Sequence, residues 1–209
     1  MGKIKELKYY DVQKVGTIKE LLEMAVEQAG DKIAFKYKDE KGKVIDVTYK
    51  EFQKDTFELG TALNSINMAD KHIAVIGENS YKWVTVYLTV LKSKGVIVPI
   101  DKELPVCDII NVLNDSDSEV LFYAKKYEKN IDEIAEKAPN VKYFIGFSTE
   151  KTEGNRLSYN EFKAEGKKLY EGGDKTYAEM ITDHNNLKML VYTSGTTGMA
   201  KGVMLSEHN

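Results

Sequence analysis

A run of small residues near the C-terminus has the residue types of a phosphate-binding loop. From Thr193 to Gly198 there is no bulky side chain, so the backbone can approach a ligand closely and turn its N–H groups toward an anion. Further hydrogen-bond donors are the hydroxyl groups of Thr193, Ser194, Thr196 and Thr197. Lys201 adds a positive charge shortly after the run. These residues at this spacing predict a cradle for a polyphosphate.

Strands are expected on both sides of this loop. Met189–Tyr192 has the apolar and aromatic content of a buried strand, and Val203–Leu205 reads as a second strand. A Walker A loop ends in Gly-Lys-Ser/Thr and enters a helix, whereas here Ala200 precedes Lys201 and Gly202 follows it. The pattern therefore disfavours a mononucleotide-binding P-loop and predicts a loop that joins two strands.

The same stretch resembles the phosphate-binding signature of the adenylate-forming superfamily, which includes acyl-CoA synthetases, luciferases and peptide-synthetase adenylation domains. The chain reads Tyr-Thr-Ser-Gly-Thr-Thr-Gly-Met-Ala-Lys-Gly over 192–202, with Ala200 where the family usually has proline. Ile76–Asn79 and Leu91–Asp101 resemble the second conserved block of acyl-CoA synthetases. The chain is therefore expected to be the N-terminal part of an acyl-CoA synthetase of the long-chain fatty acid type.

This resemblance implies a ligase that uses ATP, Mg²⁺ and coenzyme A. A carboxylate attacks the α-phosphate of ATP to give an acyl adenylate and pyrophosphate, and a thiol then takes the acyl group. The residues implied to hold the phosphates are Thr193, Ser194, Gly195, Thr196, Thr197, Gly198 and Lys201. Lys201 is the implied catalytic residue, because it draws charge toward the departing pyrophosphate, and Thr193 is the implied Mg²⁺ ligand.

The family's adenine-binding and acyl-binding motifs and its C-terminal catalytic lysine are expected beyond Asn209. The resemblance then implies that residues 1–209 are the N-terminal part of an AMP-binding domain, which is expected to be inactive alone. The incomplete sheet is expected to expose strand edges, through which the chain could self-associate.

Three alternatives remain open at this stage. The chain could belong to an amino-acid-activating adenylation domain, since the acyl pocket is not in this sequence. It could be a non-catalytic nucleotide-binding module, or an interaction domain whose loop binds nothing. Which acid is activated, and whether the acceptor is coenzyme A or a carrier-protein thiol, are not decided by these residues.

Composition narrows the class of protein. Of 209 residues, 42% are hydrophobic and 30% are charged, and the net charge of -3 gives no reason to expect nucleic acid as a partner.

The single cysteine, Cys107, excludes an internal disulfide and is expected to be buried. The longest apolar stretch, Trp83–Leu91, is too short to cross a bilayer, and no targeting segment is visible. A cytoplasmic enzyme is expected. The dispersed His72, His184 and His208 do not predict a metal site.

The remaining sequence predicts an α/β fold. Residues 1–70 are expected to form a helix from Ile18, a hairpin of Ile33–Tyr37 with Val44–Tyr49, and a second helix; capping boxes open both helices. Residues 71–209 then alternate short apolar strands with helices, as in parallel βαβ layers ending in the phosphate-binding loop. The expected strands are Ile73–Ile76, Val96–Ile100, Val120–Tyr123 and Tyr143–Phe147, with helices around Tyr81–Lys92, Val106–Leu113 and Lys126–Lys137.

The segment 148–180 is rich in lysine, glutamate and glycine. Such stretches are usually solvated surface, so Phe162–Tyr170 is expected to be an exposed helix and the segment is given no function. The acidic residues Asp115, Asp117 and Glu119 are expected to form a solvated turn before a strand.

Overall fold

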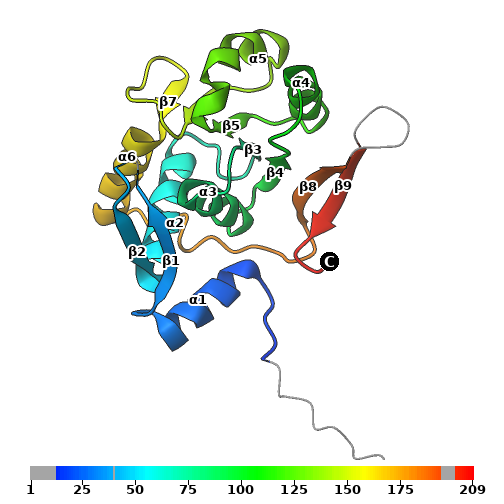
Figure 1. Cartoon of the computed structure of the whole chain (residues 1–209). Helices are drawn as coiled ribbons and strands as arrows, with labels where there is room; N and C mark the ends of the chain where they lie inside the picture. Colours follow the sequence, from blue (N-terminus) through cyan, green and yellow to red (C-terminus); the bar gives the residue numbers. More distant parts are fainter. Residues whose placement is uncertain (1–12, 40, 194–200) are drawn as a thin grey trace, which may run out of the picture.

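The computed structural model describes residues 13–39, 41–193 and 201–209. Its N-terminal elements are a helix, a β-hairpin and a second helix (Figure 1). They are α1 (Ile18–Ala29), β1 (Ile33–Lys38), β2 (Val44–Thr48) and α2 (Tyr49–Ser65). The two strands pair antiparallel, as predicted.

Both helices begin at the capping boxes that the sequence predicts. The backbone N–H of Glu20 donates to Thr17 Oγ1 at 3.1 Å, and that of Glu51 donates to Thr48 Oγ1 at 3.2 Å. Each glutamate also accepts from the backbone of its capping threonine, so donors that a helix start leaves unpaired are satisfied.

A seven-stranded sheet forms the centre of the molecule, with strand order β7-β6-β5-β3-β4-β8-β9. Its elements are β3 (His72–Ile76), α3 (Tyr81–Leu91), β4 (Val96–Ile100), α4 (Val106–Asp115), β5 (Val120–Tyr123), the 3₁₀ helix η1 (Lys125–Asn130), α5 (Ile131–Lys137), β6 (Tyr143–Gly146), β7 (Arg156–Ser158), α6 (Tyr159–Glu171), β8 (Leu187–Thr193) and β9 (Lys201–Ser206). All neighbouring strands run parallel except β9, which is antiparallel to β8.

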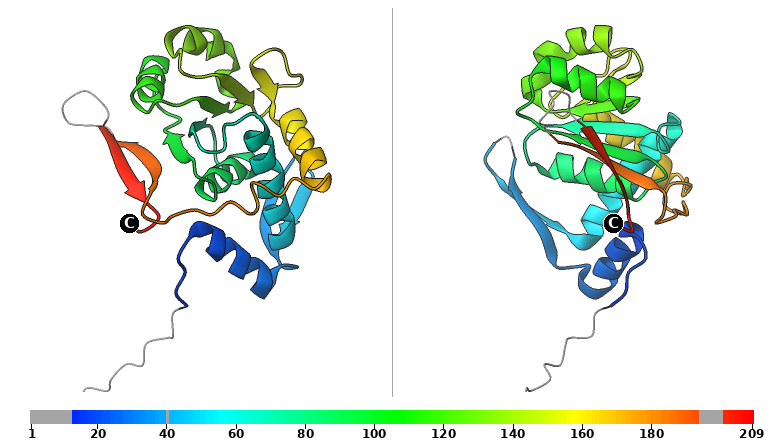
Figure 2. Two further views of the ribbon diagram at one scale, coloured as in Figure 1. Left: turned by 180° about the vertical axis from the view of Figure 1, so that it is seen from behind. Right: turned by 90° about the vertical axis from the view of Figure 1, so that its right-hand side faces the viewer.

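Successive side chains of the central strands point into two separate cores. In β3, Ile73 and Val75 contribute to the core beneath α2, α3 and α6, whereas Ala74 and Ile76 contribute to the core beneath α4 and α5. Helices therefore cover both faces of the sheet (Figures 1 and 2). This burial on both faces explains why these strands are continuously apolar, and the predicted parallel α/β fold is confirmed.

The expectation of an exposed helix within 148–180 is wrong. Helix α6 packs against α2 and buries Phe162 and Gly166, and Tyr177 is only 2% exposed. A β-carbon built on Gly166 would lie 2.0 Å from the carbonyl oxygen of Glu58, so the two helices cross at very short range. Most charged residues of α6 are exposed, but Lys163 is partly buried and pairs with Asp55 and Glu58 of α2; β7, before α6, is an edge strand of the sheet.

Two smaller expectations also need correction. Cys107 is exposed, because it lies on the face of α4 that also carries the exposed Asn111 and Asn114, and the apolar face is formed by other residues. The predicted helix around Lys126–Lys137 begins as the separate helix η1, which is common where an α-helix starts. No helix among the described residues is long and apolar enough to span a membrane.

Candidate functional site

The β8–β9 hairpin brings together the two described ends of the predicted phosphate-binding loop. Thr193 is the last residue of β8 and pairs directly with Lys201, the first residue of β9. Both residues are exposed, and so are the next three residues of β9. The prediction that the loop joins two strands is confirmed. Ser194, Gly195, Thr196, Thr197 and Gly198 lie outside the described residues.

Strand β8 ends at the carboxyl edge of the sheet. β8 runs parallel to β4, so Thr193 lies at the edge where β3, β5 and β6 also have their carboxyl ends. Ligands of open α/β sheets bind outside the carboxyl ends of the strands. The hairpin stands at the opposite end of the molecule from the β1–β2 hairpin (Figures 1 and 2). The position of Thr193 and Lys201 therefore suits a ligand-contacting loop.

Tyr192 attaches the end of β8 to the rest of the fold. Its hydroxyl group donates to Asp115 Oδ2 at 2.6 Å, at the C-terminal end of α4. Partial burial, together with this hydrogen bond to a carboxylate, raises the pKa of Tyr192. Gly202, opposite Tyr192, leaves room for its ring, since a β-carbon there would lie 3.1 Å from the tyrosine Cζ. Tyr192, just before the loop, is thus fixed by the hydrogen bond to Asp115, and the missing side chain of Gly202 leaves space for its ring.

The sequence alone does not predict this contact. Its local pattern places Asp115 only in a solvated turn, and nothing in that pattern shows that a residue 77 positions away would reach it. The nearby Asp117 does sit in a turn, with the left-handed φ of 49°. Only the spatial order of β4 and β8 brings α4 next to Tyr192.

The base of β8 is anchored by a buried lysine. Lys188 is 2% exposed and its ammonium group donates to the carbonyl oxygen of Ser93, after α3. Burial lowers the pKa of Lys188, and burial raises the pKa of Glu207 near it. The burial of β8 alternates, which corrects the prediction of a fully buried strand: β8 lies next to the edge of the sheet, and one of its faces is less covered.

The described residues contain no group of three or more His, Cys, Asp or Glu side chains that could hold a metal ion. His184 and His208 approach each other, with ring centroids 5.8 Å apart, while His72 hydrogen-bonds to Ser116 O.

Comparison with known proteins identifies the family. The family model described as "AMP-binding enzyme" matches residues 22–209. The long-chain-fatty-acid–CoA ligase ACSBG2 of Gallus gallus is 27% identical over 92% of this chain and 26% of its own length. Tyrocidine synthase 3 of Brevibacillus parabrevis is 26% identical over 77% of this chain and 2% of its own length.

A solved structure shares the fold. The anthranilate CoA ligase AuaEII, in complex with anthranoyl-AMP, superposes with a TM-score of 0.77 at 19% identity, over 91% of this chain and 35% of that protein. The chain thus spans only part of the length of the proteins it matches. With the family match over nearly all of its residues, the chain belongs to the family of AMP-binding enzymes.

Proposed function

We propose that this chain carries the phosphate-binding part of an enzyme that activates a carboxylic acid with ATP. The acid attacks the α-phosphate, forming an acyl adenylate and releasing pyrophosphate, and a thiol such as that of coenzyme A then displaces AMP. The observation that carries the proposal is the hairpin: Thr193 and Lys201 face each other, exposed, at the carboxyl edge of the sheet, in a chain of the AMP-binding family.

The proposed roles follow from charge. Carboxylate and triphosphate are both anions, so the site must neutralise and orient the triphosphate before they can react. In this proposal the phosphate-contacting residues are Thr193, Ser194, Gly195, Thr196, Thr197, Gly198 and Lys201. Lys201 supplies the positive charge that stabilises the departing pyrophosphate. Its exposed position in β9 leaves the ammonium group accessible to such a ligand.

In this proposal Mg²⁺ binds together with ATP. The hydroxyl group of Thr193 is an oxygen ligand of the kind that Mg²⁺ accepts, and few protein ligands are needed when phosphate oxygens supply the others. When bound, the ion would neutralise phosphate charge. The residues of the chain would position the phosphates around it.

We propose a fatty acid as the substrate, on the resemblance of Ile76–Asn79 and Leu91–Asp101 to acyl-CoA synthetases. The similarity to a long-chain-fatty-acid–CoA ligase supports this choice. The similarity to tyrocidine synthase 3 favours a second candidate, activation of an amino acid. A cytoplasmic location is part of the proposal.

The first test is ATP–pyrophosphate exchange by the complete gene product, with palmitate and with a panel of amino acids. Exchange that depends on palmitate supports the first candidate, and exchange that depends on an amino acid supports the second. Absence of exchange with every acid tested would refute the proposed enzymatic function. Lys201→Gln should lower the exchange rate by about 10²-fold or more. Lys129→Gln, an exposed lysine on η1, is the matched control and should leave the rate unchanged.

A second test uses the 209-residue chain alone. ATP and Mg²⁺ are titrated while the backbone amides of Gly195 and Gly198 are followed by NMR. Saturable shifts at these two glycines, lost in Lys201→Gln, are expected. Shifts confined to other parts of the chain would contradict the assignment of this loop.

A further inference from the structure

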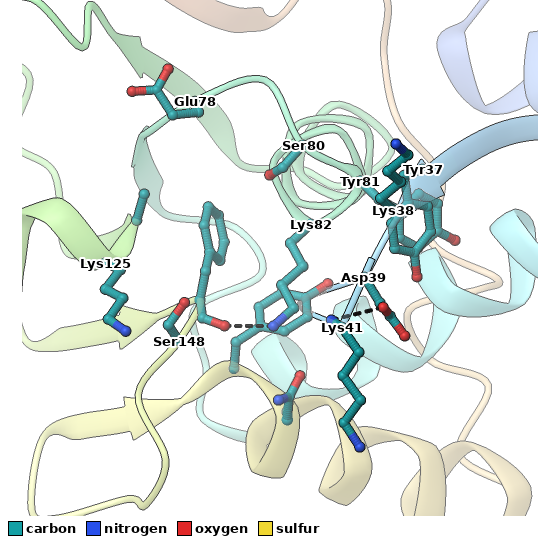
Figure 3. Close-up of a pocket in the computed structure, with 14 residues that line it drawn as sticks. Tyr37, Lys38, Asp39, Lys41, Glu78, Ser80, Tyr81, Lys82, Lys125 and Ser148 are labelled. Atoms are coloured by element: carbon teal, nitrogen blue, oxygen red, sulfur yellow. Dashed lines mark hydrogen bonds between the residues drawn. The ribbon is translucent and has the colours of Figure 1, made fainter. Parts of the chain in front are cut away.

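A cavity of about 690 Å³ lies at the carboxyl edge of the sheet, away from the β8–β9 hairpin. Five parts of the molecule form its walls: the β1–β2 hairpin, the start of α3, the segment after β5, the segment after β6, and the start of α6 (Figure 3). Its lining residues include Tyr37, Tyr81, Lys38, Lys41, Lys82 and Lys125. Its volume is within the range of about 300–1,000 Å³ that is typical of small-molecule sites.

The cavity coincides with the point where the strand order reverses. From β3 the chain moves to β4 on one side and then returns to β5 on the other. Loops that leave β3 and β5 therefore diverge and open a crevice, which is the preferred ligand site of such sheets. Ser80 and Lys125, from these two loops, both line the cavity. A β-carbon on Gly77 would lie 2.7 Å from Ala124 Cβ, so the crevice floor is already closely packed.

The charge of the cavity is opposite to that of the chain. Its described lining residues include four lysines and two acids, although the chain has a net charge of -3. Glu78 is already paired with Lys102, at 2.5 Å, and with Lys126, at 3.5 Å. Asp39 accepts from the backbone N–H groups of Lys41 and Lys43 in its own turn. The two acids are thus occupied.

For three of the four lining lysines, the described residues offer no such ion pair. Lys38, Lys41 and Lys125 form no ion pair with any residue that the structure describes; Glu40, next to Lys41, lies outside that part. Lys82 projects into the same space and donates to Phe147 O at 2.5 Å. Figure 3 shows Lys41, Lys82 and Lys125 on three different elements around the cavity. A cavity with this excess of ammonium groups in its lining favours an anionic ligand.

One wall of the cavity is aromatic and rigidly held. The rings of Tyr37 and Tyr81 stack, with centroids 5.0 Å apart and planes 5° apart. The hydroxyl group of Tyr81 donates to Asp55 at 2.7 Å, and Lys163 pairs with the same carboxylate. Flat rings stack well on aromatic faces of this kind.

We propose that this cavity binds an organic phosphate that carries a flat ring, at a site separate from the β8–β9 hairpin. The ring would lie against the wall of Tyr37 and Tyr81, and the phosphate would meet Lys41, Lys82 and Lys125. The N-terminal end of α3, which starts after Ser80, adds partial positive charge on the same side.

Flavin mononucleotide is a suitable probe, because its ring fluorescence is quenched on stacking, and riboflavin is the same ring without the phosphate. The 209-residue chain should quench flavin mononucleotide with a dissociation constant below about 1 mM. Riboflavin should bind about five-fold to ten-fold more weakly. Lys41→Gln and Lys125→Gln should each weaken flavin mononucleotide binding by about three-fold to ten-fold, and neither should change riboflavin binding.

Two controls make the result specific. Lys43→Gln removes the same charge from the same hairpin outside the cavity lining and should change affinity by less than about two-fold. Lys201→Gln should also leave flavin mononucleotide binding unchanged, which separates this site from the proposed ATP site. Circular dichroism melting curves confirm that each variant is folded.

Absence of quenching at about 1 mM probe would overturn the proposal. So would a double variant, Lys41→Gln with Lys125→Gln, that is folded and binds the probe as the wild type does. Loss of binding in Lys201→Gln alone would also overturn it, because the probe would then occupy the hairpin.

Discussion

The centre and the end of the same sheet differ sharply in burial. Every residue of β5 is buried and so is nearly every residue of β3, whereas the first four residues of β9 are exposed. Met204 on β9 is 67% exposed, and Phe122 on β5 is fully buried. The central strands have helices on both faces and a strand on either side, while β9 has a single neighbour, β8, in the described part of the chain.

The buried residues that stabilise the fold are therefore different from those proposed to contact phosphate. The former lie in β3, β4, β5 and the helices that cover them, and the latter lie at the exposed end of the β8–β9 hairpin. A loop carried on such a hairpin can change with small effects on folding. Substitutions in the two regions should therefore separate stability from ligand binding.

The largest expected effect is on the central strands. Phe122→Ala removes a fully buried ring that lies 6.4 Å from the rings of both Phe147 and Tyr159. Because transfer and cavity costs add, the free energy of unfolding should fall by about 3–5 kcal/mol. Chemical denaturation followed by circular dichroism measures this change. The matched change on the hairpin, Met204→Ala, should cost less than about 0.5 kcal/mol. Equal losses of unfolding free energy in both variants would contradict the proposed difference between the two regions.

A buried lysine next to the core should give the second effect. Lys92, at the end of α3, is 2% exposed; its Nζ donates to Thr56 Oγ1 at 2.8 Å and lies 4.3 Å from the ring centre of Phe57. Burial lowers the pKa of Lys92 to about 7. The negative charge of Glu23 acts in the opposite direction and raises this pKa, and the positive charge of Lys19 lowers it further. The unfolded chain binds a proton here up to a pH of about 10.5, and the folded chain does not.

Stability should therefore rise with pH between about 7 and 10.5, and the dependence should vanish below about pH 7, where both states are protonated. A total rise of about 2–4 kcal/mol is the expected order of magnitude. Lys92→Met should remove most of this rise when unfolding is measured by urea at several pH values. Lys94→Met, two residues on and exposed, should keep it. A pH dependence that survives in Lys92→Met would place its origin elsewhere.

The crossing of α2 and α6 should give a smaller loss. Gly166→Ala places a β-carbon 2.0 Å from the carbonyl oxygen of Glu58 and 2.7 Å from Ala62 Cβ. Since backbone must move, the better helix propensity of alanine is outweighed, and a net loss of about 2 kcal/mol is expected. Lys167→Ala, on the exposed face of α6, should change stability by less than about 0.5 kcal/mol. A stabilised Gly166→Ala would show that the helices can separate without cost.

These elements show what the sequence could predict. Threonine and glutamate three residues apart mark the starts of α1 and α2, and continuous apolar runs mark β3, β4 and β5, because the local pattern itself records burial on both faces. The loop signature likewise indicates a hairpin, and its paired strands β8 and β9 agree.

The failures concern contacts between distant segments. Helix α6 looks like solvated surface because its closest approach to α2 is at Gly166, a residue without a side chain, and because Lys163 pairs with acids of α2 that the local pattern does not reveal. Lys92 looks like an ordinary exposed charge, although it is buried. The cavity could not be predicted either, since its walls come from residues between Tyr37 and Asn160 that only the order of the strands brings together.

The smallest expected effect links the two regions. Tyr192→Phe removes the hydroxyl group that donates to Asp115 at 2.6 Å, and it leaves the half-buried ring in place. Loss of one hydrogen bond to a partly exposed carboxylate should lower the free energy of unfolding by about 1 kcal/mol. The larger consequence should be local: amide hydrogen exchange should accelerate in β8 and β9 and stay unchanged in β3 and β5. Tyr143→Phe, whose hydroxyl group makes no hydrogen bond to a described residue, is the matched control. Faster exchange throughout the sheet would mean that the hairpin is part of the cooperative core, and the proposed phosphate-binding loop would then be supported by the whole fold and not by this single contact.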